Sequence, residues 1–259
     1  MKTEDDLALA LRLATEAGDL LLEHWRTRAG LTVTTKRAGD FVSEADRAAE
    51  AQLRAGVARA RPEDGWLGEE TGAAPGGTRR WIVDPLDGTT NFLRGIGHWA
   101  VSIALEDNGT RILGVVHDPI RGETFSARAG RGTRLNGVPL GVAENADLSG
   151  ALFATGIPFG DMPHIDDHAA DIARLAPTCA GIRRMGAAAL DLAWVAAGRF
   201  DGFWERRLQA WDAAAGLVLV REAGARVEGW TPAERPEQSG TVLTATPALF
   251  PAFARIVRG

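Results

Sequence analysis

The segment 84–92, which reads Asp-Pro-Leu-Asp-Gly-Thr-Thr-Asn-Phe, carries the residues best suited to chemistry in this chain. It follows the apolar run 81–83, which is typical of the end of a buried strand. Gly88 permits a sharp turn, and Thr89 and Thr90 are typical of residues that cap a following helix. Such a turn can direct two carboxylates and the N–H groups of a helix start at one point. Carboxylates bind hard cations and helix N-termini bind phosphate, so the segment indicates metal-assisted phosphate chemistry.

Further acidic residues lie next to expected structural boundaries: Asp46 and Asp212 at helix starts, and Glu69 with Glu70 at the end of a short strand. Element ends are where functional sites are usually built. Each residue also has a structural interpretation. Asp46 and Asp212 are suited to stabilising a helix start, and the two glutamates to a solvated surface. Asp-Pro and Asp-Gly pairs are ordinary turn formers, so 84–92 alone does not decide between a turn and a site.

The bulk properties are those of an ordinary globular protein. The chain has 259 residues, enough for one large domain or two intimate subdomains, with 45% hydrophobic and 24% charged residues. A net charge of −5 argues against a nucleic-acid-binding surface, and the single Cys179 excludes an intrachain disulfide. The acidic start at 1–6 and the lack of an apolar run of ~18 residues predict no signal peptide and no membrane span. We therefore expect a cytoplasmic protein.

Hydrophobic periodicity and turn signals predict a layered α/β (α+β) fold whose first half is more antiparallel. Helices are expected over 7–25 (capped by Thr3), 44–60 (capped by Ser43), 164–176, 187–197, 212–223 and 248–257. Strands are expected over 66–70, 81–83, 99–106, 111–117, 124–127, 151–155, 203–205 and 241–245. The pairs Asn108-Gly109 and Asn136-Gly137 predict tight turns. Residues 36–40 are expected to form a loop, and 71–78 a Gly-rich linker.

The chain resembles the inositol monophosphatase family, within the larger group that includes the fructose-bisphosphatases. The resemblance rests on 68–70 (Gly-Glu-Glu), 84–92 and 211–216 (Trp-Asp-Ala-Ala-Ala-Gly), with support from 40–46, 114–119 and 184–191. It extends from about residue 7 to residue 250 in the family's order. It implies one domain over 1–259 with the αβαβα sandwich of the sugar phosphatases. Within it, an α+β subdomain with an antiparallel sheet spans about 1–145, and an α/β subdomain spans 146–259.

The resemblance also implies roles for individual residues. Two or three Mg²⁺ ions are implied to have six ligands: the carboxylates of Glu69, Glu70, Asp84, Asp87 and Asp212, and the carbonyl of Leu86. Thr89 and Asp46 are implied to orient and deprotonate the attacking water, and they form the implied catalytic set with Glu69 and Asp87. The residues implied to bind the substrate are Lys36, Gly88, Thr89, Gly186, Ala187, Ala188 and Glu205.

Elementary electrostatics agrees with these implied roles. Several carboxylates near a phosphate dianion repel one another strongly at low local dielectric, so bound cations are needed. Mg²⁺ prefers oxygen ligands, which suits a set without histidine or thiol. We expect in-line attack by a metal-activated water, without a phosphoenzyme.

The resemblance leaves several substrates open. Glu205 lies seven residues before Asp212, the spacing that the family uses for a carboxylate facing an inositol hydroxyl, which favours inositol monophosphate. Histidinol phosphate, 3′(2′),5′-bisphosphate nucleotides and fructose bisphosphate are the alternatives on the same site. A regulatory protein that binds a macromolecule, with catalysis secondary, is the alternative of another class. The resemblance further implies a homodimer and inhibition by lithium.

Overall fold

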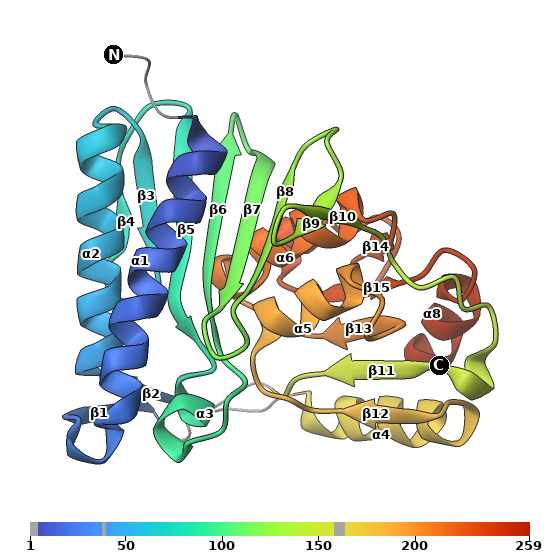
Figure 1. Ribbon diagram of the computed structural model, residues 1–259. Helices are drawn as coiled ribbons and strands as arrows, with labels where there is room; N and C mark the ends of the chain where they lie inside the picture. Colours follow the sequence, from blue (N-terminus) through green and yellow to red (C-terminus); the bar gives the residue numbers. More distant parts are fainter. Residues whose placement is uncertain (1–4, 38–39, 158–163) are drawn as a thin grey trace.

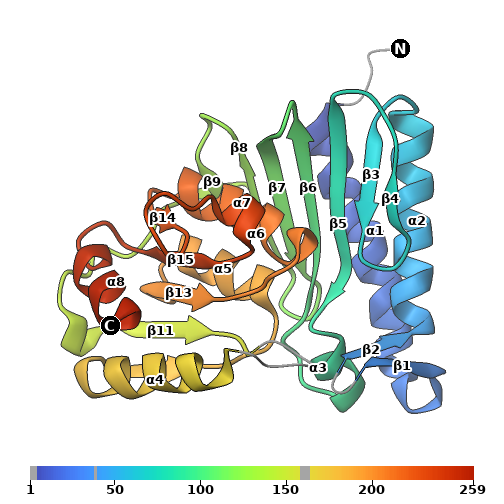
Figure 2. The ribbon, with the colours of Figure 1, turned by 180° about the vertical axis from the view of Figure 1, so that it is seen from behind.

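Two β-sheets alternate with three layers of helices in this structure (Figures 1 and 2). It is a computed structural model, and it describes residues 5–37, 40–157 and 164–259. The helices are α1 (Asp6–Arg26), α2 (Glu44–Ala60), α3 (Thr89–Arg94), α4 (Ile165–Leu175), α5 (Ala188–Ala196), α6 (Ala210–Glu222), α7 (Pro236–Ser239) and α8 (Phe250–Arg258). Short 3₁₀ turns occupy Arg28–Gly30, Leu148–Gly150 and Ala176–Thr178.

The larger sheet has eight strands in the order β10-β9-β8-β7-β6-β5-β3-β4. They are β3 (Gly65–Gly68), β4 (Gly72–Ala74), β5 (Arg79–Asp87), β6 (Ala100–Asp107), β7 (Thr110–Asp118), β8 (Glu123–Arg128), β9 (Thr133–Leu135) and β10 (Val138–Leu140). Neighbouring strands are antiparallel, except that β3 and β5 are parallel. Side chains alternate between the faces along β5: Trp81 and Val83 pack with α1 and α2, and Ile82 packs with α5 and α6.

The smaller sheet has five strands in the order β12-β11-β13-β15-β14. They are β11 (Leu152–Thr155), β12 (Gly181–Arg183), β13 (Gly202–Glu205), β14 (Arg226–Glu228) and β15 (Val242–Ala245). Its inner face packs on α5 and α6, and its outer face packs on α8 and the end of α4. Helices α5 and α6 therefore lie between the two sheets, which explains why α6 is apolar on nearly every side. The layers form an αβαβα sandwich, which confirms the expected fold class.

The local signals in the sequence account for much of this architecture. The β6–β7 and β9–β10 hairpins turn at Asn108-Gly109 and Asn136-Gly137, and all four residues have positive φ, as the predicted tight turns require. Ser43 caps α2 by accepting a hydrogen bond from the backbone N–H of Ala45. The prediction that Thr3 caps α1 lies outside the described residues. The division into one domain with two subdomains stays a prediction.

Three local predictions were wrong. Lys36, Arg37 and Asp40 of the expected loop 36–40 belong to strands, because β1 (Val33–Arg37) pairs antiparallel with β2 (Asp40–Ser43) in a separate two-stranded sheet. Residues 38–39 lie outside the described part of the structure. The linker 71–78 contains the edge strand β4, which pairs with β3. Thr89 and Thr90 do not cap α3. The N-cap is Gly88, whose φ of 93° is left-handed, and the Thr89 hydroxyl is directed elsewhere. Among the described residues, no helix has the length and apolar character to cross a membrane.

Candidate active site

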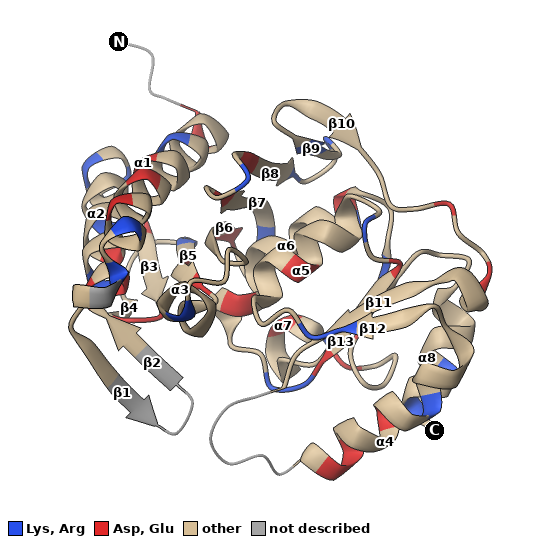
Figure 3. Ribbon diagram, turned by 60° about the horizontal axis from the view of Figure 1, so that its bottom comes forward, with Lys and Arg blue, Asp and Glu red and all other residues tan. Residues whose placement is uncertain are grey.

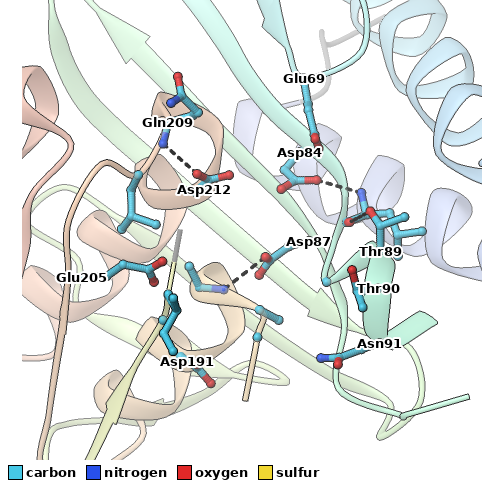
Figure 4. Close-up of a pocket in the computed structure, with 18 of the residues that line it drawn as sticks. Glu69, Asp84, Asp87, Thr89, Thr90, Asn91, Asp191, Glu205, Gln209 and Asp212 are labelled. Atoms are coloured by element: carbon cyan, nitrogen blue, oxygen red, sulfur yellow. Dashed lines mark hydrogen bonds between the residues drawn. The ribbon is translucent and has the colours of Figure 1, made fainter. Parts of the chain in front are cut away.

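A cavity opens where the end of β5 meets the first turns of α5 and α6. Figure 4 shows Glu69 after β3, Asp84 and Asp87 on β5, Glu205 on β13 and Asp212 on α6 facing it. In Figure 3, acidic segments are seen at the ends of the elements around α3, α5 and α6. The full lining is Glu69, Asp84, Leu86, Asp87, Gly88, Thr89, Thr90, Asn91, Gly156, Ile157, Arg184, Gly186, Ala187, Ala188, Asp191, Glu205, Arg207, Leu208, Gln209 and Asp212.

A β-bulge brings Asp84 and Asp87 to the same side of β5. Residues three apart on a regular strand point to opposite faces of the sheet. Here the pairing with β6 shifts register, because Asp84 lies opposite Ser102 whereas Asp87 lies opposite Ala100. Three steps on β5 thus match two steps on β6, and the extra residue turns both carboxylates into one cavity.

Asp84 lies at the centre of a repulsive cluster. Its side chain is buried, and its Oδ1 accepts a hydrogen bond of 2.9 Å from the backbone N–H of Leu86. Burial raises the pKa of Asp84 well above its ordinary value, and the nearby carboxylates of Glu69, Asp87 and Asp212 raise it further. Only a proton or a cation relieves such a cluster, so the site favours binding of positive charge.

Asp87 is held by the start of α5. Its Oδ1 accepts from the backbone N–H of Ala188 at 3.1 Å, and its Oδ2 accepts from those of Ala189 at 2.8 Å and Leu190 at 3.3 Å. Burial, followed by the charge of Asp191, nevertheless raises the pKa of Asp87 to about 7. The helix start therefore fixes the orientation of this carboxylate, but it does not fully offset the free energy needed to bury its charge.

Thr89 and Asp46 form a pair behind the cavity wall. The Thr89 hydroxyl lies 2.9 Å from Asp46 Oδ1 and 3.1 Å from the Leu86 carbonyl oxygen, and it can donate to either. Asp46 Oδ2 accepts from the backbone N–H of Ser43 at 2.9 Å and from its hydroxyl. Burial raises the pKa of Asp46. The structure thus brings together two predicted residues that are 43 positions apart, in the geometry of a hydroxyl and its proton acceptor.

The opposite wall carries the residues expected to bind the substrate. Gly186, Ala187 and Ala188 line the cavity at the start of α5, and Glu205 enters from the end of β13. Gly156 makes room for this glutamate, since a Cβ there would lie 2.0 Å from Glu205 Oε2. Burial raises the pKa of Glu205 well above its ordinary value, with Asp212 adding to the effect.

Asp46 and Glu70 are not among the residues that line this cavity. Glu70 lies beside it at the β3–β4 turn, where its backbone N–H donates to Glu50 at 2.7 Å. Lys36 belongs to β1, but its side chain lies outside the described part of the structure. The expected roles of Glu70 as an outer metal ligand and of Lys36 as a phosphate contact stay predictions.

The sequence interpretation missed several residues that support the site. Asn91 donates from Nδ2 to the carbonyl oxygens of His98 and Met185, both at 2.8 Å, and so ties α3 to the loop before α5. His98 Nε2 lies 3.0 Å from Asp191 Oδ1 in a buried contact, and burial lowers the pKa of this histidine to about 4. Asn91 lies inside the 84–92 segment, which was a local signal. The His98–Asp191 contact joins residues 93 positions apart, so no local pattern in the sequence indicated it.

The donor chemistry of the cavity fits Mg²⁺. Among the described residues, no three His, Cys, Asp or Glu side chains converge closely enough to hold a metal ion by themselves. Mg²⁺ commonly keeps several waters and binds proteins through one or two carboxylates together with substrate phosphate oxygens. The buried Asp84 cluster supplies the oxygen donors and the unbalanced negative charge that such a cation requires.

The five layers and the acidic cavity place the chain in the sugar-phosphatase fold class. The model of the inositol monophosphatase family matches residues 2–259, so this chain belongs to that family, as its motifs indicated.

Similar proteins carry two kinds of name. An inositol-1-monophosphatase from Rhizobium meliloti is 44% identical over 249 residues, which cover 94% of this chain and 92% of the relative. The Nus factor SuhB of Pseudomonas aeruginosa is 42% identical over 258 residues, which cover 97% of this chain and 95% of the relative. The crystal structure of the extragenic suppressor protein SuhB from Bartonella henselae matches with a TM-score of 0.93 at 39% identity and covers 96% of each chain.

Proposed function

We propose that this chain is a Mg²⁺-dependent phosphomonoesterase that hydrolyses a small polyol phosphate, inositol monophosphate, to the polyol and phosphate. The observation that carries this proposal is the hydrogen-bonded pair of Thr89 and Asp46 beside the buried carboxylates of Asp84 and Asp87. The pair suits activation of water, and the carboxylates suit divalent cations. Both flank one cavity that is open to a small ligand.

In the proposed reaction, the carboxylates of Glu69, Asp84, Asp87 and Asp212 and the Leu86 carbonyl would hold Mg²⁺, which would supply positive charge to the phosphate and lower the pKa of water. Asp46 accepts the Thr89 hydroxyl proton, so that the Thr89 oxygen is directed at the attacking water and receives its proton. The water oxygen bonds to phosphorus as the ester P–O bond breaks in line with it. The water proton moves to the Thr89–Asp46 pair, and the leaving alkoxide takes a proton from solvent. Gly88, Thr89 and Lys36 are assigned to the phosphate.

Glu205 is the proposed determinant of a polyol substrate. It is buried at the end of β13 and points into the cavity (Figure 4), which Gly186, Ala187 and Ala188 also line. A carboxylate there accepts hydrogen bonds from hydroxyl groups, and an unpaired buried acceptor costs free energy when a substrate lacks them. This favours a substrate with free hydroxyl groups, and the seven-residue spacing between Glu205 and Asp212 is the reason for proposing inositol monophosphate over histidinol phosphate, bisphosphate nucleotides and fructose bisphosphate.

A regulatory role is the second candidate. It is favoured by the 42% identical relative from Pseudomonas aeruginosa, which is named a Nus factor. In this candidate the chain contacts a macromolecular partner, and hydrolysis is secondary.

We also propose a homodimer in the cytoplasm and inhibition by Li⁺ at one of the metal positions. Analytical ultracentrifugation tests the dimer, and inhibition that is unaffected by substrate concentration but changes with Mg²⁺ tests the Li⁺ site.

Phosphate release from a panel of substrates tests the proposal. The panel contains inositol 1-phosphate, histidinol phosphate, adenosine 3′,5′-bisphosphate, fructose 1,6-bisphosphate and glycerol 2-phosphate, each with Mg²⁺. We expect the highest kcat/KM for inositol 1-phosphate and loss of activity in Asp87→Asn. A preference for another substrate would keep the chemistry and reject the assigned substrate. No release from any of them by folded protein with Mg²⁺ would favour the regulatory candidate.

A further inference from the structure

Glu50 is a buried carboxylate that the proposed reaction does not use. It lies on α2, and its side chain faces the turn between β3 and β4. Its Oε2 accepts from the backbone N–H of Glu70 at 2.7 Å. Its Oε1 accepts from the backbone N–H of Thr71 at 2.8 Å and from the Thr71 hydroxyl. One carboxylate thus satisfies three donors of a single turn, and hydrogen bonds to a charged acceptor are the strong ones.

This turn carries two of the expected metal ligands, Glu69 and Glu70. Glu69 is fixed on one side by β5, because its backbone N–H donates to the Val83 carbonyl oxygen at 3.2 Å. It is fixed on the other side by Glu50, which holds the next residue. The approach is close, since a Cβ on Gly68 would lie 2.5 Å from Glu50 Oε1. The glycine of the 68–70 segment therefore makes room for this contact.

Helix α2 connects the turn to the pair that is proposed to activate water. Asp46 and Glu50 are four residues apart, so they lie on the same face of α2, one turn from each other. Asp46 bonds to Thr89 at the start of α3, and Glu50 bonds to the turn that carries Glu69. One rigid helix thus sets the position of one expected metal ligand relative to the proton acceptor.

We propose that Glu50 is a positioning residue for the metal site. It touches neither substrate nor metal. It acts through the backbone of Glu70 and Thr71, and so holds Glu69 in register with the Thr89–Asp46 pair. This inference rests on the proposed function. Residues that orient metal ligands from behind typically change metal affinity 10–100-fold when they are replaced.

The variant Glu50→Gln tests this role with little change in volume. Its amide has one oxygen and one NH₂ group, so one donor of the turn loses its acceptor and faces another donor. Glu222→Gln is a matched control. Glu222 on α6 accepts from the backbone N–H groups of Gly130, Arg131 and Gly132 at 2.9, 3.0 and 2.9 Å, and so holds a different turn by the same kind of contact. Glu222 and this turn do not line the candidate active site.

Isothermal titration of Mg²⁺ into the folded protein without substrate is the deciding measurement. We expect the Kd for Mg²⁺ to rise at least about tenfold in Glu50→Gln and to stay unchanged in Glu222→Gln. With inositol 1-phosphate, high Mg²⁺ should restore kcat in Glu50→Gln to within a few-fold of the wild type. Thr71→Val removes a hydroxyl that donates to Glu50 and accepts from the Trp66 indole N–H at 3.1 Å, and it should raise the Kd in the same direction by a smaller factor.

Each result has a distinct meaning. If Glu50→Gln and Thr71→Val are folded and bind Mg²⁺ as tightly as the wild type, Glu50 only stabilises the fold and the proposal is wrong. If Glu50→Gln does not fold, an unchanged Kd in Thr71→Val rejects the proposal, and a raised Kd supports it. If the wild type itself binds no Mg²⁺, it is the proposed function that fails.

Discussion

At the scale of single residues, Asp46 and Asp212 each serve a helix and the candidate site. Each is the third residue of its helix and accepts from the backbone N–H three positions earlier: Ser43 at 2.9 Å for Asp46, and Gln209 at 2.7 Å for Asp212. A carboxylate in this position is stabilising and has a restricted orientation. The capping interpretation and the functional interpretation therefore hold together, because the helix start aims the side chain that the site needs.

Replacing Thr89 should affect the reaction far more than the fold. Thr89→Ala removes the hydroxyl that bonds to Asp46 and that we propose to orient the attacking water, and loss of general-base assistance costs about 10²–10⁴-fold in rate. We expect kcat with inositol 1-phosphate at saturating Mg²⁺ to fall within this range, with an unchanged Kd for Mg²⁺. Thr89→Ser keeps the hydroxyl and is expected to retain most of the activity. A kcat for Thr89→Ala within tenfold of the wild type would remove Thr89 from the mechanism.

Residue types at element ends predicted the acidic part of the site, but not its supports. Asp84, Asp87 and Asp212 stand beside strand and helix signals that a sequence displays locally. Glu50 and the His98–Asp191 contact display none, because their roles depend on contacts across 20 and 93 residues that only the folded chain creates. Glu50 lies in the middle of an amphipathic helix, where a glutamate is ordinarily solvated.

At the scale of elements, close packing of α6 on the larger sheet fixes the position of Asp212 relative to the carboxylates on β5. Gly114 on β7 lies against Ala215 on α6, and a Cβ at Gly114 would meet the Ala215 carbonyl oxygen at 2.5 Å. Any side chain at this position pushes α6, and Asp212 with it, away from the sheet. The small residues of the 211–216 segment and Gly114 on the strand thus both allow α6 to pack close to the sheet.

Gly114→Ala should therefore destabilise the fold. Overpacking of a well-packed contact costs about 1–3 kcal/mol, and we expect this loss in the free energy of unfolding measured with denaturant. The Kd for Mg²⁺ should rise as well, because Asp212 moves with α6. Gly150→Ala is the control, since a Cβ there meets nothing within 4 Å, and it should change stability by less than about 0.5 kcal/mol. Equal stability of the two variants would show that the fold does not depend on the close contact between Gly114 and α6.

Long, periodic elements were predictable and short edge strands were not. Helix α1 has a clear apolar period, strand β5 contains the apolar run 81–83, and the Asn-Gly turns are explicit in the sequence. The β1–β2 hairpin has irregular register, and β12 and β14 have three residues each, so their patterns are too short to stand out. The bulge between Asp84 and Asp87 arises from pairing with β6, which no local pattern displays.

At the scale of the whole molecule, the acidic site should dominate how metal-free stability depends on pH. The pKa of Asp87 is raised from 3.8 to about 7 in the folded protein, and the pKa values of Asp84 and Glu205 are raised as well. Between about pH 4 and 7 these carboxyl groups bind more protons in the folded protein than in the unfolded chain, so their contribution to stability falls as pH rises. His98, His117 and His168 have lowered pKa values and act in the opposite direction below about pH 6.5. Asp6 and Glu237 have lowered pKa values, so their stabilisation is lost below about pH 4.

We therefore expect the melting temperature in EDTA to be higher near pH 5 than near pH 8. Mg²⁺ should raise it most at the higher pH, because a bound cation replaces the missing protons and binds only the folded state. Differential scanning calorimetry at both pH values, with EDTA and with Mg²⁺, makes this comparison. A metal-free protein that melts at a higher temperature at pH 8 than at pH 5 would show that ionising the buried carboxylates does not destabilise the fold.

The most direct test of the central claim is the Mg²⁺ dependence of phosphate release from inositol 1-phosphate by wild-type protein and Asp84→Asn. The asparagine can still accept the hydrogen bond from Leu86, so the bulge is kept while one buried charge is removed. We predict that the wild type is inactive without Mg²⁺ and saturates with it. Asp84→Asn should lose at least about 10²-fold in kcat/KM and melt no lower than the wild type in EDTA. Equal rates with and without Mg²⁺, or an Asp84→Asn variant with wild-type activity and Mg²⁺ dependence, would contradict the claim that these carboxylates hold the catalytic metal.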